Sequence, residues 1–310
     1  DASLYVALAD AYPSLVTFYT SEHTSESARA QRKGSLIDRH WILTSADHGY
    51  DTREAIDLEV AGILYEEVRI EHWFTHPCFS HGAAASDLAL LHVTNPPWPA
   101  LQDYPELYEG QDELGKVLVL VGSGALSKGE SGEDAVKLPE DLLNATNQVD
   151  LVDEHLIGFS FDSPDDQLST VLEGIESAGH SGGPALMCEE LSLDPLGRIT
   201  CTGKRYILGV RVAEERAIAS SPQEVYGERQ EYTRISRYHH WIRSAMTTKD
   251  AGSCADAQEH WEGPNEDASL QTFAGGCEGA PGTPSTLLLV CALLAFIARR
   301  KSPRWLNPDT

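Results

Sequence analysis

Short apolar or alternating runs, separated by turn residues, recur through most of the chain. Clear examples are residues 56–60, 88–93, 116–121 and 206–212, each rich in Val, Ile or Leu. Runs of this length and pattern are typical of β-strands that are buried on one face or on both. The pattern therefore predicts a mainly β body of many short strands, arranged as a barrel or a sandwich.

One amphipathic helix is predicted near residue 240. Ile235, Tyr238, Trp241 and Ile242 stand at positions i, i+3, i+6 and i+7, which places their side chains on one helical face. Such a face suits a helix that packs on a β core, and we expect it to close the folded body at about residue 246.

The chain changes character twice after residue 246. Residues 247–284 are rich in Gly, Ala, Pro and acids and have no hydrophobic period, so we interpret them as an extended linker. Residues 287–298 form an unbroken apolar run, and basic residues follow at 299–301. A helix of this run would span about 18 Å, less than the ~30 Å hydrocarbon core. We interpret residues 285–301 as a sorting or anchor segment and 302–310 as a tail; a buried C-terminal helix is the alternative.

Composition narrows the classes of partner. The 310 residues are 41% hydrophobic, enough for a large core, and the formal net charge is -25. A chain this acidic has no sequence-independent attraction for nucleic acid phosphates, so we expect no nucleic-acid partner.

The candidate chemistry lies in the sequence Gly-His-Ser-Gly-Gly-Pro at residues 179–184. A serine in a tight glycine turn can present its hydroxyl while neighbouring backbone N–H groups point at one spot, as an oxyanion hole requires. Ser-Gly-Gly-Pro alone is also an ordinary turn, so its interpretation depends on the other motifs along the chain.

Over residues 1–246 the set of motifs resembles the trypsin/chymotrypsin-like serine protease family. The landmarks follow in the family's order: Gly34-Ser35-Leu36-Ile37, Trp41-Ile42-Leu43-Thr44-Ser45-Ala46, Thr75-His76-Pro77, Ser86-Asp87-Leu88-Ala89-Leu90-Leu91, Gly122-Ser123-Gly124 and Ile207-Leu208-Gly209-Val210. The resemblance implies an all-β fold of two antiparallel six-stranded β-barrels, about residues 1–110 and 111–246, with a C-terminal helix. It also implies hydrolysis of a protein or peptide substrate between the barrels, without a cofactor.

The resemblance assigns roles to single residues. Ser181 matches the nucleophile, Asp87 matches the carboxylate that orients the base, and Gly179 with Ser181 matches the oxyanion hole. In ungapped register Asp47 stands on the position of the catalytic histidine, and His48 follows on the next position. A one-residue bulge after Ala46 would bring His48 to the nucleophile; otherwise Asp47 itself occupies the base position.

The specificity pocket and the activation switch also depart from the family. Ile175 stands at the usual floor of the pocket, and Val212 and Glu214 stand on the substrate-binding strand. If the register holds, small or apolar side chains fit better than basic ones. His180 replaces the aspartate that normally receives the new N-terminus, so activation by that route is not expected.

Two function classes remain open. The first is an exported, surface-tethered serine endopeptidase, and the second is a catalytically degenerate trypsin-like module that binds a protein. Residues 275–282 resemble the Gly/Cys/Pro box of myxobacterial sorting tails, which implies a secreted or cell-surface location and attachment to the membrane or cell surface.

The cysteines and histidines bear on stability and on metal binding. Cys188 and Cys201 flank a predicted turn between two strands, so we expect a disulfide between them, with two free thiols as the alternative. The roles of Cys78, Cys254 and Cys277 stay open. The histidines have no convincing ligand spacing, and we predict no metal site.

Overall fold

The computed structural model describes residues 2–7, 11–19, 31–47, 55–128, 133–176, 180–212 and 226–258. The predicted sorting segment, most of the predicted linker, His48, Gly179, Glu214 and Cys277 lie outside these ranges. Among the described residues no helix is long and apolar enough to cross a membrane.

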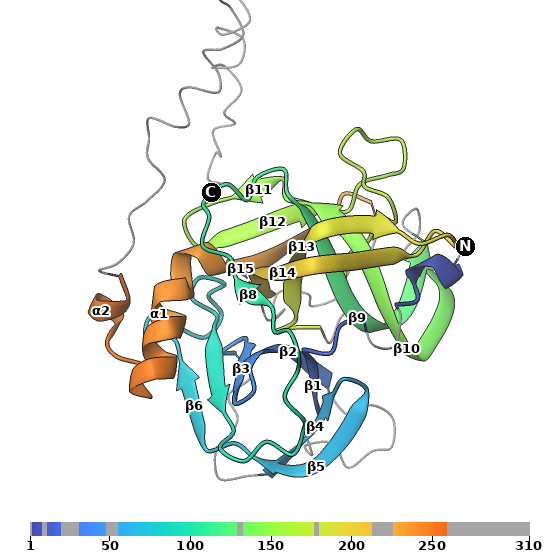
Figure 1. The fold of residues 1–310 in the computed structure, drawn as a ribbon. Helices are drawn as coiled ribbons and strands as arrows, with labels where there is room; N and C mark the ends of the chain where they lie inside the picture. Colours follow the sequence, from blue (N-terminus) through green and yellow to red (C-terminus); the bar gives the residue numbers. More distant parts are fainter. Residues whose placement is uncertain are drawn as a thin grey trace, which may run out of the picture. The chain divides into compact units, whose positions relative to one another are not determined.

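The first half of the chain forms a curled antiparallel sheet of seven strands (Figure 1). Its order is β5-β4-β1-β2-β3-β7-β6. The strands are β1 (Leu15–Tyr19), β2 (Gln31–Asp38), β3 (Trp41–Thr44), β4 (Ala55–Val60), β5 (Ile63–Arg69), β6 (His72–Thr75) and β7 (Ala89–His92). The alternating sequence of β4 gives alternating burial along the strand, as a half-buried strand requires.

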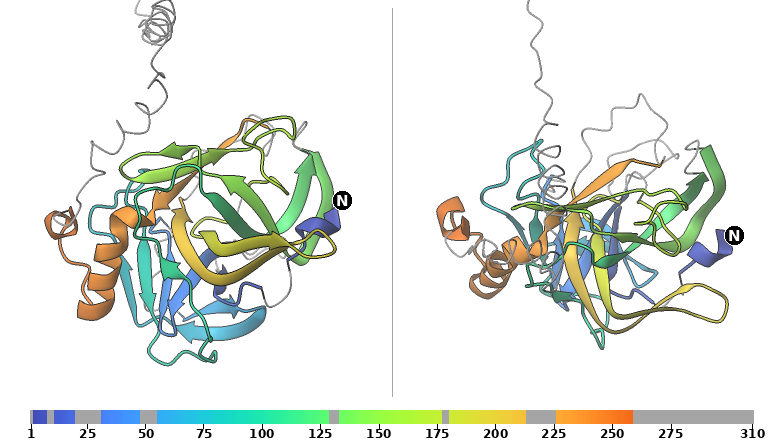
Figure 2. Two further views of the ribbon diagram at one scale, coloured as in Figure 1. Left: turned by 45° about the horizontal axis from the view of Figure 1, so that its top comes forward. Right: turned by 90° about the horizontal axis from the view of Figure 1, so that it is seen from above.

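The second half forms a sheet of eight strands. Its antiparallel path is β10-β9-β13-β14-β15-β12-β11, and β8 pairs with β14 in parallel. The strands are β8 (Glu106–Leu107), β9 (Val117–Lys128), β10 (Glu133–Gln148), β11 (Leu151–Val152), β12 (Leu156–Ser160), β13 (Pro184–Leu193), β14 (Ile199–Arg211) and β15 (Arg229–Arg234). Figure 2 shows the long β13–β14 hairpin curving away from the end of the sheet that bears the C-terminal helix.

The predicted helix is α1 (Ile235–Thr248), and its apolar face is buried as the spacing predicted. It continues past residue 246, and a second helix, α2 (Cys254–Gln258), follows. Cys254 forms a disulfide with Cys78, which lies between β6 and β7. Residues 247–258, assigned to the linker from their composition, are therefore part of the folded body, because a disulfide and helix packing hold a segment without a strong hydrophobic period.

The core has three parts. One apolar cluster fills the first sheet, one fills the second, and the third joins both sheets to α1. The third cluster contains Leu43 of the first sheet, Val121 of the second and Trp241 of α1. Of the candidate-site residues, those that the structure describes (Asp47, Asp87, Ile175, Ser181 and Val212) come from the loops and strand ends of both sheets.

Candidate active site

Ser181 lies in the turn that precedes β13, where the two sheets meet. The residue is 4% exposed. Gly182 next to it has a φ of 84°, and a Cβ there would collide with the Thr44 hydroxyl and the Lys33 carbonyl. Glycine is required at this position both by the backbone conformation and by the close approach of the first sheet. The glycine-rich sequence thus lets the serine turn pack directly against β2 and β3.

Hydrogen bonds fix the serine turn to both sheets. The Lys33 N–H of β2 donates to the Ser181 carbonyl at 2.9 Å. From the second sheet, Gly182 N–H donates to the Arg211 carbonyl at 2.8 Å, and Arg211 N–H donates to the Gly183 carbonyl at 2.9 Å. The nucleophile candidate is therefore held on a backbone tied on both sides, as a preorganised site requires.

Asp87 precedes β7 and is 2% exposed. Its Oδ1 accepts the backbone N–H of Ala46 at 2.6 Å and that of Asp47 at 2.9 Å. Its carbonyl accepts the Thr233 hydroxyl of β15 at 3.3 Å. The carboxylate is thus oriented by the segment that follows β3, and its backbone is tied to the second sheet.

The same segment links Asp87 to the serine turn. A Cβ on Gly182 would lie 3.1 Å from the Ser45 nitrogen, and the next residue, Ala46, donates to Asp87. Segments that carry Ser181, Asp87 and Asp47 therefore meet within a few residues of one another. The structure places Asp47, through its backbone, next to Asp87.

The carboxylate of Asp47 pairs with a histidine. Its Oδ1 lies 3.1 Å from Nδ1 of His81, whose side chain is 78% exposed. An exposed pair of this kind contributes little to stability. Chemically, a carboxylate can accept a proton, but it lacks the two opposed nitrogens by which an imidazole connects a serine to an orienting aspartate.

The predicted pocket positions flank an ion pair that the sequence did not reveal. Ile175 packs against the core cluster of the second sheet, and Val212 is half-buried. Glu176, one residue after Ile175, and Arg211, one before Val212, have side chains only 3% and 2% exposed. Arg211 Nη1 lies 3.8 Å from Glu176 Oε2. In the sequence, this ion pair is indicated only by a charged residue next to each predicted pocket position.

Strand β15 holds this pair in place. The Tyr232 hydroxyl donates to Glu176 Oε2 at 2.9 Å. The Gln230 side chain accepts the Glu176 N–H and donates to the Glu176 carbonyl. Burial, followed by the nearby Glu176 charge, raises the pKa of Tyr232 well above its usual value. The tyrosine therefore remains a neutral donor to the carboxylate.

His180 and Lys33 are both buried near the serine turn. The His180 ring, 5% exposed, lies so close to Gly122 that a Cβ there would collide with it. Lys33 Nζ donates to the Thr17 hydroxyl at 2.9 Å. Burial lowers the Lys33 pKa to about 8, although Glu59 and Glu176 attract its charge.

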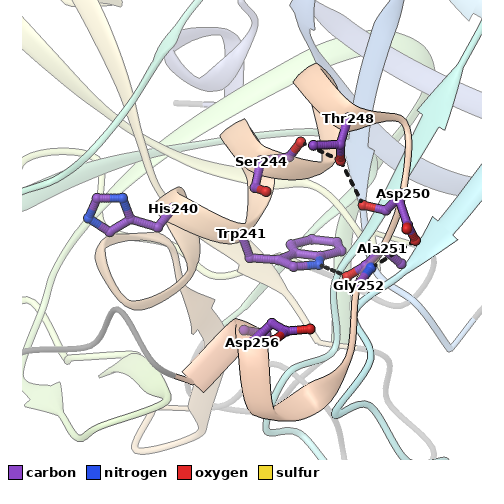
Figure 3. Close-up of a pocket in the computed structure, with 9 residues that line it drawn as sticks. His240, Trp241, Ser244, Thr248, Asp250, Ala251, Gly252 and Asp256 are labelled. Atoms are coloured by element: carbon purple, nitrogen blue, oxygen red, sulfur yellow. Dashed lines mark hydrogen bonds between the residues drawn. The ribbon is translucent and has the colours of Figure 1, made fainter.

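A pocket of about 280 Å³ lies elsewhere, between α1, α2 and the loop that joins them (Figure 3). Trp241 forms one wall, and its indole N–H donates to the Ala251 carbonyl at 3.0 Å. None of Ser181, Asp87 or Asp47 lines this pocket. Within the described ranges, no group of three or more His, Cys, Asp or Glu side chains could hold a metal ion.

The predicted Cys188–Cys201 disulfide is confirmed, and the alternative of two free thiols is wrong. The second disulfide, Cys78–Cys254, was not predicted. Cross-links of this kind suit an extracellular protein.

Comparison with solved structures agrees with the fold. Neuropsin, a serine protease expressed in the limbic system of mouse brain, superposes with a TM-score of 0.51 at 16% sequence identity. The match covers 78% of this chain and 98% of neuropsin. No family model matches the sequence, and no curated protein matches it.

The chain thus has the trypsin-like fold, with two curled antiparallel sheets and a C-terminal helix. In the part of the chain that the structure describes, the sheets have seven and eight strands, where the resemblance implied six each.

Proposed function

We propose that this protein is an exported, surface-tethered serine endopeptidase of the trypsin-like type. Ser181 would attack the peptide carbonyl, and Asp87 would orient the base. The oxyanion hole would be formed by the backbone N–H groups of Gly179 and Ser181.

The observation that supports this proposal best is that the Ser181 turn packs against the segment that orients Asp87. Gly182 packs against Thr44 and Ser45, and the next two backbone N–H groups donate to the Asp87 carboxylate. A nucleophile and an orienting carboxylate, on separate sheets and both buried, are the fixed parts of a serine hydrolase site. The trypsin-like fold supports a protein or peptide as substrate.

The base is His48 or Asp47. His48 has the chemistry of a general base, because an imidazole can take the serine proton with one nitrogen and bond Asp87 with the other. Asp47 occupies the aligned position of the base, and its backbone N–H donates to the Asp87 carboxylate.

Export and tethering rest on sequence features and on the disulfides. Two disulfides suit an oxidising compartment, and the residues after 284 carry the apolar run and basic end of a sorting tail. We propose that this tail attaches the protein to the membrane or cell surface.

A second candidate function is a catalytically degenerate, protein-binding module. The Asp47 carboxylate favours it, since its imidazole partner is His81, an exposed side chain, and no imidazole occupies position 47. Loss of the triad histidine costs about 10⁶ in kcat in subtilisin, so a site without a base would have negligible turnover.

Labelling with a fluorophosphonate probe tests the proposal. The full chain should be labelled, Ser181→Ala should not, and intact mass should place the label on Ser181. If His48 is the base, His48→Ala abolishes labelling and Asp47→Ala does not. If Asp47 is the base, Asp47→Ala abolishes labelling and His48→Ala does not.

The degenerate alternative makes the opposite forecast. The native chain would not be labelled, and Asp47→His would restore labelling because it places an imidazole beside Asp87. His81→Ala is the matched control, since it removes a histidine that contacts Asp47 without changing position 47 or 48. Unlabelled native protein would contradict the peptidase proposal.

A further inference from the structure

The buried Glu176–Arg211 pair lies directly beside the serine turn. Arg211 is hydrogen-bonded through its backbone to both Gly182 and Gly183. A Cβ on Gly183 would lie 3.6 Å from Glu176 Oε1. The carboxylate is therefore within van der Waals reach of the turn that carries Ser181, on the side of the second sheet.

Both charged side chains are enclosed by protein. Their exposed fractions are 3% and 2%, and Tyr232 and Gln230 fix the position of Glu176 from β15. Charges this deeply buried are tolerated when they are paired and hydrogen-bonded. The guanidinium of Arg211 thus occupies space next to Glu176 and balances its charge.

A lone carboxylate at this place would favour a basic side chain on the substrate. With Arg211 beside it, the carboxylate already has a cation, and a substrate cation would have to displace a side chain of the protein. Lys33 is a further cation whose charge Glu176 attracts, and its ammonium donates to Thr17 on the first sheet.

We propose that the Glu176–Arg211 pair fills the side-chain pocket beside Ser181 and restricts the site to small, uncharged side chains. The pair excludes basic side chains because the Glu176 charge is already balanced. It excludes large side chains because Arg211 occupies the space. This inference rests on the proposed function, since it assigns that site its substrate class.

Binding of benzamidine, a flat aromatic cation, tests the proposal without requiring catalysis. Arg211→Ala removes the guanidinium that lies beside the Glu176 carboxylate. We expect this variant to bind benzamidine at least about tenfold more tightly than the native chain, by titration calorimetry at pH 8. Benzamide has a similar shape but no charge. Its affinity should therefore increase less than that of benzamidine when Arg211 is replaced with alanine.

The matched control is Arg205→Ala, which removes another arginine from β14, at a position paired with Cys188 and away from the serine turn. It should bind benzamidine no better than the native chain. Far-ultraviolet circular dichroism and thermal unfolding establish that each variant is folded.

A second variant covers the case in which Arg211→Ala does not fold, because removing one member of a buried pair is strongly destabilising. Glu176→Ala/Arg211→Ala removes both charges and opens an uncharged space. It should bind benzamide and benzamidine equally, and each more tightly than the native chain does.

Two results would overturn the inference: native protein that binds benzamidine as tightly as Arg211→Ala, or folded variants that bind neither ligand. Ligand binding needs no proton transfer. If the variants bind benzamidine as expected but the native chain is not labelled by the fluorophosphonate, only the peptidase proposal is contradicted. If the native chain is labelled but the variants do not bind as expected, only the pocket proposal is contradicted.

Discussion

Replacing Lys33 with methionine should change how the stability of the protein depends on pH. The Lys33 side chain is buried between the first sheet and the serine turn, and its ammonium donates a hydrogen bond to the Thr17 hydroxyl. Methionine keeps an unbranched chain of similar length and removes the charge.

The magnitude follows from the pKa of Lys33. Burial lowers it from 10.5 to about 8. Each unit of difference between the folded and unfolded states corresponds to about 1.4 kcal/mol, so at pH 7 the folded state bears a cost of about 3 kcal/mol for holding this ammonium. Between pH 8 and 10.5 the unfolded chain binds more protons at Lys33 than the folded chain does. Stability therefore rises with pH across that window.

Urea unfolding at pH 7 and at pH 10.5 measures the effect, because every other titrating group is common to both proteins. The native chain should gain about 3 kcal/mol relative to Lys33→Met between the two pH values. Lys204→Met is the control, since Lys204 is exposed and should show no such change. A difference between native and Lys33→Met that is independent of pH would refute the reasoning.

Three further predictions concern the frame of the site. Replacing Cys78 and Cys254 with alanine opens a loop of sequence separation 176, and chain entropy gives a loss of about 5 kcal/mol in urea unfolding; a loss below about 1 kcal/mol would contradict this. Gly122→Ala should lower stability by about 1–3 kcal/mol by displacing the His180 ring, and a neutral effect on thermal unfolding would show that the ring moves freely. Burial lowers the His76 pKa from 6.5 to about 4, so the folded state disfavours protonation, and stability should fall by up to about 3 kcal/mol as pH drops through that window. His76→Gln should remove this component from the pH profile of unfolding.

Much of the fold could be predicted from hydrophobic period. Residues 56–60 alternate and form most of β4 with alternating burial, and the run at 88–93, apolar except for His92, contains β7, which is buried along its length. The helix face anchored by Trp241 is buried as predicted. These succeed because burial on one face imposes the pattern on the sequence directly.

What could not be predicted depends on contacts between distant residues. The Cys78–Cys254 bridge is one case, because cysteine spacing does not reveal connectivity. The Glu176–Arg211 pair is another, because a charged residue next to an apolar strand residue normally faces solvent. The contact between Asp47 and His81 likewise depends on how two loops meet.

The Cys78–Cys254 bridge also determines how the body would bear a mechanical load. Residues 79–253, which include Ser181, Asp87 and the Glu176–Arg211 pair, lie inside the covalent loop that the bridge closes. Tension applied along the chain from beyond α2 toward the first strands crosses from Cys254 to Cys78 through the disulfide. The backbone of the serine turn therefore lies outside the covalent path of that force for as long as the bridge stays oxidised.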